Sequence, residues 1–389
     1  MKVLAVIPTI FGSSGDAVNE RQLLIALAKR VEKCYVVTFI SLKEIFMKKG
    51  ELGTNLPKNI ILIPIPFPFL KTFTAKAVLS FIAIIVGFLV SLFEEIDLIY
   101  VRYSFLSLGF LAFPSLARKT VVKIGAIFED EILGDSFTKF LIKKFAPFAD
   151  RLVLARARRI AVNNRVFYYE LVRRRLYKHK ANPVEIPPGI DPNLIKKVKN
   201  QAKIKKLLQE DFKNIGFIGT LLWWQGVDIL VRAIAMLKET VPNVRLVIIG
   251  DGELRNSVEK LCKELRVNCM ITGYLPHEKA LQYLNELDIM VLPSRKLSTT
   301  ESNIPIKVIE AWALGIPVVV TAHKVFLMNG IKNNEDVVYC EPEPTSVARA
   351  ILLVAGNNAL KKKLIENGPK LASHFYYDKI AENLLSCVR

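Results

Sequence analysis

The chain has 389 residues, which suggests two or three domains, and 51% of them are hydrophobic, enough for large buried cores. Its net charge of +19 indicates an anionic partner (lipid headgroups, a phosphate-linked acceptor or nucleic acid) unless the charge serves solubility alone. Neither the five cysteines nor the four histidines show metal-ligand spacing, and no signal peptide is visible, so we expect no metal and free thiols in a reducing cytoplasm.

The positive charge is concentrated in the first half of the chain. Residues 1–190 carry 28 Lys and Arg against 15 Asp and Glu, and residues 139–180 alone hold 13 basic and two acidic residues. Phenylalanines interleave with lysines across residues 137–148. Such a segment suits the headgroup boundary of a membrane, and a core helix is an equally good interpretation.

At the N-terminus the pattern predicts a strand over residues 3–7, a glycine-containing loop over 8–15 and a helix over 16–29. Gly12 and Gly15 in this loop allow backbone to approach a ligand at the carboxyl end of the strand. The spacing is not a G-x-G-x-x-G fingerprint, and an ordinary tight turn is the alternative.

Further strands are predicted over residues 35–40, 60–63 and 121–124. Residues 77–93 contain no charge, but these 17 residues fall short of the roughly 20 that cross a bilayer, so we expect a buried or interfacial helix. Asp130, between Glu129 and Glu131, follows the strand at 121–124; it is a candidate to contact an acceptor hydroxyl or simply part of a polar loop.

The strand and helix pattern starts again after a domain boundary placed near residue 190 and a lysine-rich connector at 196–206. Strands are predicted over residues 215–219, 247–250 and 288–292, near 271, and over 318–320 and 336–340. Helical patterns between them indicate an α/β protein with doubly wound parallel sheets. Candidate ligand-binding positions at the strand ends include Gly219, Gly226 and Gly250.

Residues 305–314 are predicted to form a helix that follows a polar loop and precedes a buried strand. Free N–H groups near Ile304, Pro305 and Ile306, with the helix dipole, favour an anion such as a diphosphate there. Lys307 and Arg295 would add positive charge, and Glu310 could accept hydrogen bonds from a ribose 2′,3′ pair. The alternative is a surface helix on which Lys307 and Glu310 pair with each other.

The run of residues 303–319, with Pro305, Lys307 and Glu310, resembles the donor-binding signature of the family-four retaining glycosyltransferases of GT-B fold. It is most similar to the branch that reads Pro-x-Lys-x-x-Glu. Many members carry a second glutamate eight positions earlier, where this chain has Ser302, with Glu301 one place off. Gln225 stands where many members have a diphosphate-binding lysine.

The resemblance implies two Rossmann-like domains, one over 1–190 for the acceptor, joined by a returning helix at about 373–389, and one over 191–372 for the nucleotide sugar. It implies that Gly12 and Gly15 face the acceptor and donor phosphates and that residues 273–275 face the base. The implied reaction is retaining transfer from a UDP- or GDP-sugar to a lipid-linked or polysaccharide acceptor. The leaving diphosphate would take the acceptor proton, with Lys307, Glu310 and Asp130 as the catalytic candidates and no cofactor beyond the donor.

The expected setting is the cytoplasm, with peripheral attachment to the inner face of an anionic membrane as an open alternative. Other functions remain: a non-catalytic or epimerase GT-B protein that binds sugar nucleotides, or a basic nucleic-acid-binding protein. A nucleic-acid binder would show aromatic stacking platforms among its basic residues, whereas the phenylalanines here follow an amphipathic pattern.

Overall fold

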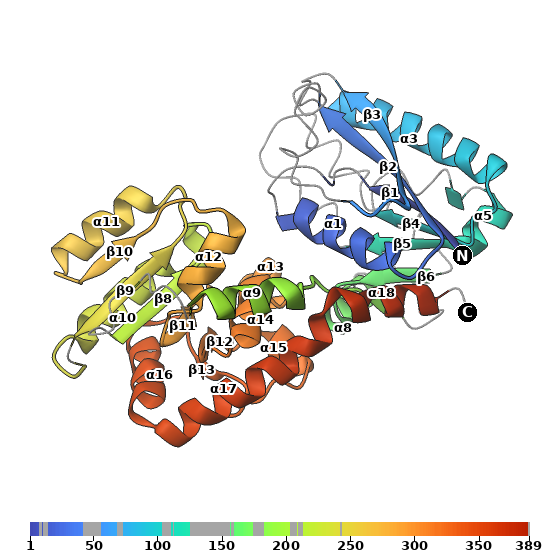
Figure 1. Cartoon of the computed structure of the whole chain (residues 1–389). Helices are drawn as coiled ribbons and strands as arrows, with labels where there is room; N and C mark the ends of the chain where they lie inside the picture. Colours follow the sequence, from blue (N-terminus) through green and yellow to red (C-terminus); the bar gives the residue numbers. More distant parts are fainter. Residues whose placement is uncertain are drawn as a thin grey trace. The chain divides into compact units, whose positions relative to one another are not determined.

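The computed structural model describes residues 1–7, 10, 15–41, 56–67, 73–102, 110–111, 113–124, 156, 159–173, 183–202, 208, 213–241 and 243–387. The chain divides into two compact units (Figure 1). Unit 1 comprises Met1–Gly189 and Tyr377–Arg389, and unit 2 comprises Ile190–Tyr376.

Unit 1 is built on a parallel sheet that, in the described part of the chain, has seven strands in the order β3-β2-β1-β4-β5-β6-β7. The strands are β1 (Lys2–Ile7), β2 (Lys33–Ser41), β3 (Ile60–Phe67), β4 (Leu98–Arg102), β5 (Thr120–Ile124), β6 (Arg159–Val162) and β7 (Val184–Glu185). Its helices include α1 (Gly15–Ala28), α3 (Phe73–Phe93), α5 (Pro114–Lys119), α8 (Arg165–Arg173) and α18 (Tyr377–Ser386).

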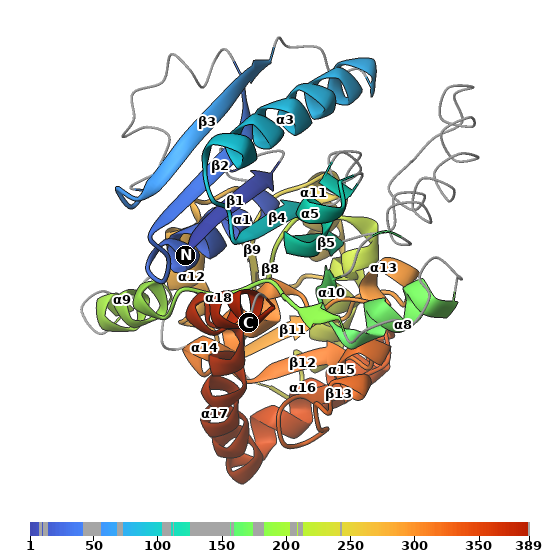
Figure 2. The ribbon, with the colours of Figure 1, turned by 90° about the vertical axis from the view of Figure 1, so that its right-hand side faces the viewer.

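Successive residues of β1 point to opposite faces of this sheet, and both faces are covered. Val3 and Ala5 belong to a buried cluster with side chains of α1 and α18, whereas Leu4 and Val6 belong to a second cluster with side chains of α3. Figures 1 and 2 show α1 and α3 on opposite sides of the sheet. Unit 1 is therefore doubly wound, as the uninterrupted apolar strands predict.

The C-terminal helix α18 belongs to unit 1 and packs against α1. The Asn19 side chain of α1 accepts hydrogen bonds from the Gly189 N–H at 3.0 Å and from the Tyr377 hydroxyl at 3.2 Å. Arg30 adds ion pairs to Asp378 and Glu382. These contacts attach the last helix of the chain to the first.

The apolar segment at residues 77–93 lies within α3, so the predicted helix is confirmed. No helix in the described part of the chain combines the length and the apolar character that crossing a membrane requires. One face of α3 packs on the sheet through Ala83, and the side chains of Ile85 and Leu89 on another face are exposed.

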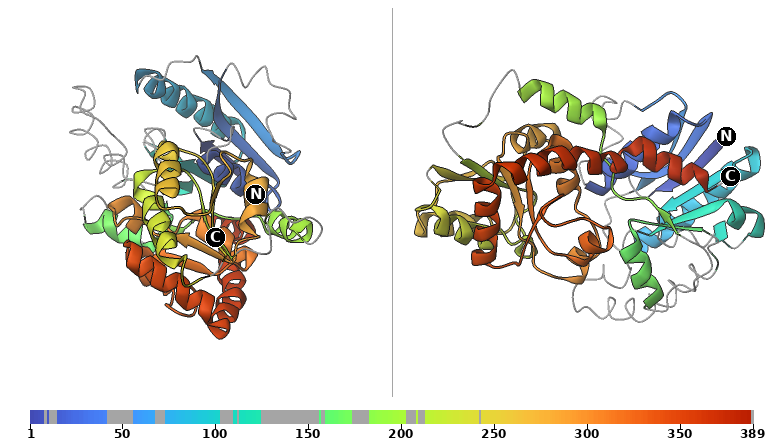
Figure 3. Two further views of the ribbon diagram at one scale, coloured as in Figure 1. Left: turned by 90° about the vertical axis from the view of Figure 1, so that its left-hand side faces the viewer. Right: turned by 90° about the horizontal axis from the view of Figure 1, so that it is seen from below.

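Unit 2 contains a second parallel sheet, with the order β10-β9-β8-β11-β12-β13 among the described strands. These are β8 (Lys213–Ile218), β9 (Val244–Ile249), β10 (Cys269–Ile271), β11 (Ile289–Leu292), β12 (Val318–Thr321) and β13 (Val338–Cys340). The accompanying helices are α9 (Pro192–Ala202), α10 (Val227–Leu237), α11 (Arg255–Glu264), α12 (His277–Leu284), α13 (Ser298–Glu301), α14 (Ile306–Leu314), α15 (Lys324–Met328), α16 (Pro344–Gly356) and α17 (Asn358–Ala372), with one-turn helices η1 (Trp223–Gln225) and η2 (Ser373–Phe375). Figure 3 shows the consecutive helices α16 and α17 meeting at a bend.

In unit 2 the strand order reverses between β8 and β11, which are neighbours although two strands, β9 and β10, separate them in sequence. In open parallel sheets, ligands bind at the carboxyl ends of the strands at such a reversal. The segments that follow β8 and β11 are η1 and the loop that leads through α13 to α14. They contain most of the predicted donor-binding residues.

Three details of unit 2 differ from the sequence predictions. The lysine-rich connector begins as a helix, α9, and the polar loop before α14 contains the short helix α13. Pro305 is the N-cap of α14 and not its first helical residue, because its ψ of 136° is extended. Its fixed φ suits either position, so composition alone did not separate the two.

Candidate functional site

Lys307 stands in the first turn of α14 and reaches across to the segment that follows β8. Its ammonium nitrogen donates to Gln225 Oε1 at 3.1 Å and lies 4.6 Å from the centre of the buried Phe217 ring. A Cβ atom added at Gly219 would collide with this nitrogen. Since Gly219 has a φ of +134°, a side chain there would also strain the backbone. The ammonium group of α14 thus occupies the turn after β8.

The environment of Lys307 is poorly suited to a permanent charge. Burial lowers the pKa of its ammonium to about 8, although the charge of Glu310 opposes the change. Its hydrogen-bond acceptor, Gln225, is a neutral amide. A cation that has lost hydration and has no carboxylate within ion-pair distance attracts an incoming anion strongly.

Glu310 lies one turn further along α14 and is 96% buried, with 4% of its surface exposed. Its Oε1 atom is 2.6 Å from Nε2 of His277, the first residue of α12. This hydrogen bond raises the pKa of His277, against the opposing effect of burial. Lys307 and Glu310 therefore bind separate partners from distant parts of the sequence and do not form the surface pair considered above.

Arg295, the third predicted charge, is engaged elsewhere. Its two Nη atoms bind the Asp228 carboxylate at 3.0 and 2.7 Å, and one of them also donates to the Trp223 carbonyl. The guanidinium lies 4.7 Å from the centre of the Trp223 ring. Bidentate pairing satisfies the charge of Arg295, so Lys307 is the better candidate to bind a diphosphate.

Two predicted glycines have a packing role as well as a place at the strand ends. Gly226, with a φ of +72°, lies so close to the Pro293 carbonyl that a Cβ atom would clash with it. Gly250 likewise lies against the Gly219 carbonyl. Both allow the segments after β8, β9 and β11 to approach closely at the strand reversal.

The turn after β10 contains Gly273, Tyr274 and Leu275, which were predicted to face the base. Gly273 forms an antiparallel bridge with Gly250, and the Tyr274 side chain is 71% exposed. An exposed aromatic ring can accept the flat face of a base.

At the start of α14 the predicted anion site is a regular helix start. Ile306 and Lys307 are its first two residues, so their N–H groups have no acceptor within the helix. The Pro305 carbonyl accepts from Val308 and Ile309, and Ile304 is buried. The unpaired first-turn amides and the Lys307 side chain thus belong to the same helix start.

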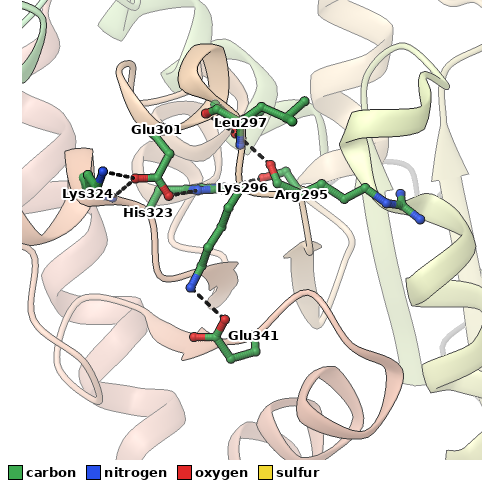
Figure 4. Close-up of polar contacts among 9 residues, drawn as sticks. Arg295, Lys296, Leu297, Glu301, His323, Lys324 and Glu341 are labelled. Atoms are coloured by element: carbon green, nitrogen blue, oxygen red, sulfur yellow. Dashed lines mark hydrogen bonds and ion pairs between the residues drawn. The ribbon is translucent and has the colours of Figure 1, made fainter. Parts of the chain in front are cut away.

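A second polar cluster was not predicted. His323, which follows β12 and is 1% exposed, is 2.7 Å from Ser294 Oγ through Nε2 and 3.4 Å from Glu301 Oε1 through Nδ1. Glu301 also accepts from the Lys324 N–H at the start of α15 (Figure 4). A histidine directly after a buried strand was the available sequence signal. The cluster ties the ends of β11 and β12 to α13, and in Figure 4 the Arg295 side chain points away from it.

The remaining candidates belong to unit 1. Gly15 is the first residue of α1, while Gly12, Asp130 and the phenylalanine-lysine segment at 137–148 lie outside the described residues. All five cysteines are free, and four of them are buried. Among the described residues, no group of three or more His, Cys, Asp or Glu side chains is placed to hold a metal ion.

Comparison with known proteins shows which family unit 2 resembles. Residues 198–371 match the family of glycosyl transferases group 1. An uncharacterized glycosyltransferase of Methanocaldococcus jannaschii is 28% identical over 183 residues, which cover 46% of this chain and 45% of the relative. The match thus spans about half the length of that relative.

Solved structures extend the likeness to the whole chain. Sucrose-phosphate synthase from Thermosynechococcus elongatus has a TM-score of 0.71 at 17% identity, covering 99% of this chain and 97% of its own. HepE from Anabaena, solved with UDP, has a TM-score of 0.68 at 17% identity and covers 99% of each chain. At this identity the likeness shows the fold, and the prediction of two parallel-sheet domains in a GT-B protein is confirmed.

Proposed function

We propose that this protein, whose residues 198–371 match the glycosyl transferases of group 1, is a retaining glycosyltransferase. It would move a sugar from a nucleotide-sugar donor, a UDP- or GDP-sugar, to a lipid-linked or glycan acceptor. The observation that carries the proposal is the position of Lys307. Its ammonium binds Gln225 at the strand reversal, so α14 supplies the charge that Gln225 lacks. The UDP found in HepE supports a nucleotide-sugar donor.

In the proposed mechanism the protein stabilises the leaving diphosphate. The Lys307 ammonium and the first-turn amides of α14 would bind the phosphate oxygens, and Glu310 would accept hydrogen bonds from the ribose hydroxyls. The acceptor hydroxyl would attack from the side that the diphosphate leaves, forming the new glycosidic bond as the bond to the phosphate oxygen breaks. Its proton would pass to the departing diphosphate. This route retains the anomeric configuration and requires no nucleophilic side chain.

A donor screen tests the proposal. UDP-, GDP- and ADP-sugars should each be added to the protein and the melting temperature measured, since a ligand at 100 times its Kd stabilises by about 2.7 kcal/mol. We expect a UDP- or GDP-sugar to raise the melting temperature of the wild-type chain and to have little effect on Lys307→Ala. Equal shifts for both proteins would overturn the role of Lys307, and the absence of any shift would overturn the donor assignment. The anomeric configuration of the product, read by NMR, tests retention.

An acceptor in a membrane is supported by the exposed side of α3. Ile82, Ile85, Leu89, Leu92 and Phe93 recur at helical spacing, and their exposures rise to 84% at Phe93. Together with a net charge of +19, this stripe suits an anionic bilayer surface. We expect co-flotation with vesicles rich in anionic lipid, and at least tenfold weaker flotation for the double variant Ile85→Glu, Leu89→Glu. Wild-type protein that stays with the soluble fraction at low salt would contradict this attachment.

A further inference from the structure

The hydrogen bond between His277 and Glu310 joins two parts of unit 2 that the proposed mechanism does not connect. His277 begins α12 directly after Pro276 and the turn at residues 273–275, and Glu310 lies in the second turn of α14. The two side chains meet at 2.6 Å although 33 residues separate them. Glu310, the proposed ribose-binding residue, is therefore held by α12, the helix that follows the proposed base-binding turn at residues 273–275.

The two partners differ in exposure. The Glu310 side chain is 6% exposed, whereas the His277 side chain is 48% exposed. A buried carboxylate needs a donor, and an imidazole N–H on Oε1 fixes the direction in which the group points. Because each carboxylate oxygen can accept more than one hydrogen bond, Oε2 and part of Oε1 stay available to two neighbouring hydroxyls.

Other charged groups near His277 have partners of their own. Glu278 on α12 binds Lys197 on α9 at 2.8 Å, and Lys279 lies over the Tyr283 ring. On α14, Lys307 binds Gln225. Glu310 is accordingly the carboxylate with which His277 pairs, and its hydrogen bond raises the pKa of the imidazole. A protonated imidazole donates to Glu310 more strongly than a neutral one.

We infer that His277 is a positioning residue that holds Glu310 in the geometry that distinguishes a ribose from a 2-deoxyribose. The inference rests on the proposed function, since it assumes that Glu310 binds the donor ribose. Without the imidazole, Glu310 can rotate, and the hydrogen bond to the 2′-hydroxyl weakens. The expected loss is in discrimination at the 2′ position more than in overall stability.

The test measures the Kd values of UDP and 2′-deoxy-UDP by calorimetry, with GDP and 2′-deoxy-GDP in parallel. The proteins are the wild type, His277→Ala, His277→Gln and Glu310→Gln. The exposed histidine His374, whose Nδ1 contacts the Leu371 carbonyl, provides the matched control His374→Ala. Circular dichroism melting curves establish that each variant is folded.

We expect the wild type and His374→Ala to prefer the ribonucleotide by about 10- to 100-fold, the value of one hydrogen bond to a charged group. Glu310→Gln should lose most of this preference, and His277→Ala should lower it about tenfold. His277→Gln keeps an N–H donor, so its preference for the ribonucleotide should lie between those of the wild type and His277→Ala.

Three results would overturn the inference, and they differ in what else they overturn. A preference in His277→Ala equal to that of the wild type, with the preference lost in Glu310→Gln, would remove only the role of His277. A preference unchanged in both variants would also remove the ribose role of Glu310. A wild-type protein that binds neither UDP nor GDP would remove the proposed function itself.

Discussion

The six described strands of unit 2 follow the same order as the first six of unit 1, but the two units differ in the chemistry at the strand reversal. In unit 1 the reversal lies between β1 and β4, and in unit 2 between β8 and β11. Beside the first, the buried Glu20 carboxylate accepts from the Tyr100 hydroxyl at 3.1 Å and from Arg102 at 3.3 Å. Beside the second, the Lys307 ammonium meets a neutral amide.

This difference separates a charge used for packing from a charge available to a ligand. Glu20 is 1% exposed and is neutralised by a cation within unit 1. Lys307 carries a cost of burial that a bound diphosphate would offset. The fold alone therefore does not show which unit binds the donor. The partners of Glu20 and Lys307 distinguish the two units, because Glu20 pairs with a cation and Lys307 with a neutral amide.

The largest expected effect comes from removing the ammonium of unit 2. Lys307→Met should lower turnover by about 2.7–4 kcal/mol of barrier, or 100- to 1,000-fold, as expected for the loss of one group that stabilises the transition state. It should also raise the stability of the ligand-free chain at pH 7 by on the order of 1 kcal/mol, because a poorly solvated cation is removed. Turnover with the donor found in the screen and urea unfolding measure the two effects.

Lys260, an exposed residue of α11 paired with Glu264, provides the matched control Lys260→Met. Neither turnover nor stability should change in it by more than a small factor. A Lys307→Met chain that is both less stable and fully active would mean that the Lys307 charge, like that of Glu20, serves packing and not ligand binding.

The opposite behaviour is expected in unit 1. Glu20→Ala leaves the Tyr100 hydroxyl and the Arg102 guanidinium without this acceptor and should cost about 2 kcal/mol of unfolding free energy. The Kd of UDP should stay unchanged, because Glu20 belongs to the other unit. Glu95→Ala, at an exposed position after α3, is the control for both measurements. If Glu20→Ala weakens UDP binding tenfold while its urea midpoint is unchanged, Glu20 is a ligand-binding group and the distinction fails.

The lowered pKa of Lys307 makes donor binding depend on pH. The ammonium has a pKa of about 8 in the folded chain and 10.5 in the unfolded one, so its burial cost is present below about pH 8 and disappears as pH rises towards 10.5. A bound diphosphate favours the protonated form, so binding of UDP-glucose at pH 8 should take up about 0.5 proton. Calorimetry in buffers of different ionisation enthalpy measures this uptake. Lys307→Met should show none, and uptake that persists in the variant would assign it to another group.

Most of the fold could be predicted from the sequence because local signals agree there. Each apolar run predicted as a strand is a parallel strand, and the helix over residues 306–314 starts beside Pro305 and ends at Gly315, whose φ of 79° suits glycine. The donor-site candidates Lys307 and Glu310 follow from their place in the first turns of this helix.

The partners of these candidates could not be predicted in the same way. Gln225 and His277 each have an ordinary local setting, one beside a turn glycine and one after a proline. Their contacts with α14 arise because the segments after β8, β10 and β11 lie at the same edge of the parallel sheet. No local sequence pattern predicts such a contact. Arg295 shows the reverse error: a free cation was expected, but Asp228, 67 residues away, pairs with it.

The smallest expected effect distinguishes two histidines within unit 2. Burial lowers the pKa of His323, so protonation opposes folding, and its contribution to stability is lost as pH falls below about 6.5. The hydrogen bond to Glu310 raises the pKa of His277, so its contribution is present below about 6.5 and is lost as pH rises through the raised pKa. Each histidine changes the unfolding free energy by at most about 1.4 kcal/mol per pH unit. We therefore expect the free energy of unfolding, measured with urea between pH 5 and 8, to fall less than in the wild type towards low pH for His323→Asn. For His277→Gln it should fall less than in the wild type towards high pH. Identical pH profiles for the two variants would mean that the pKa values of the two histidines are not shifted in opposite directions in the folded chain.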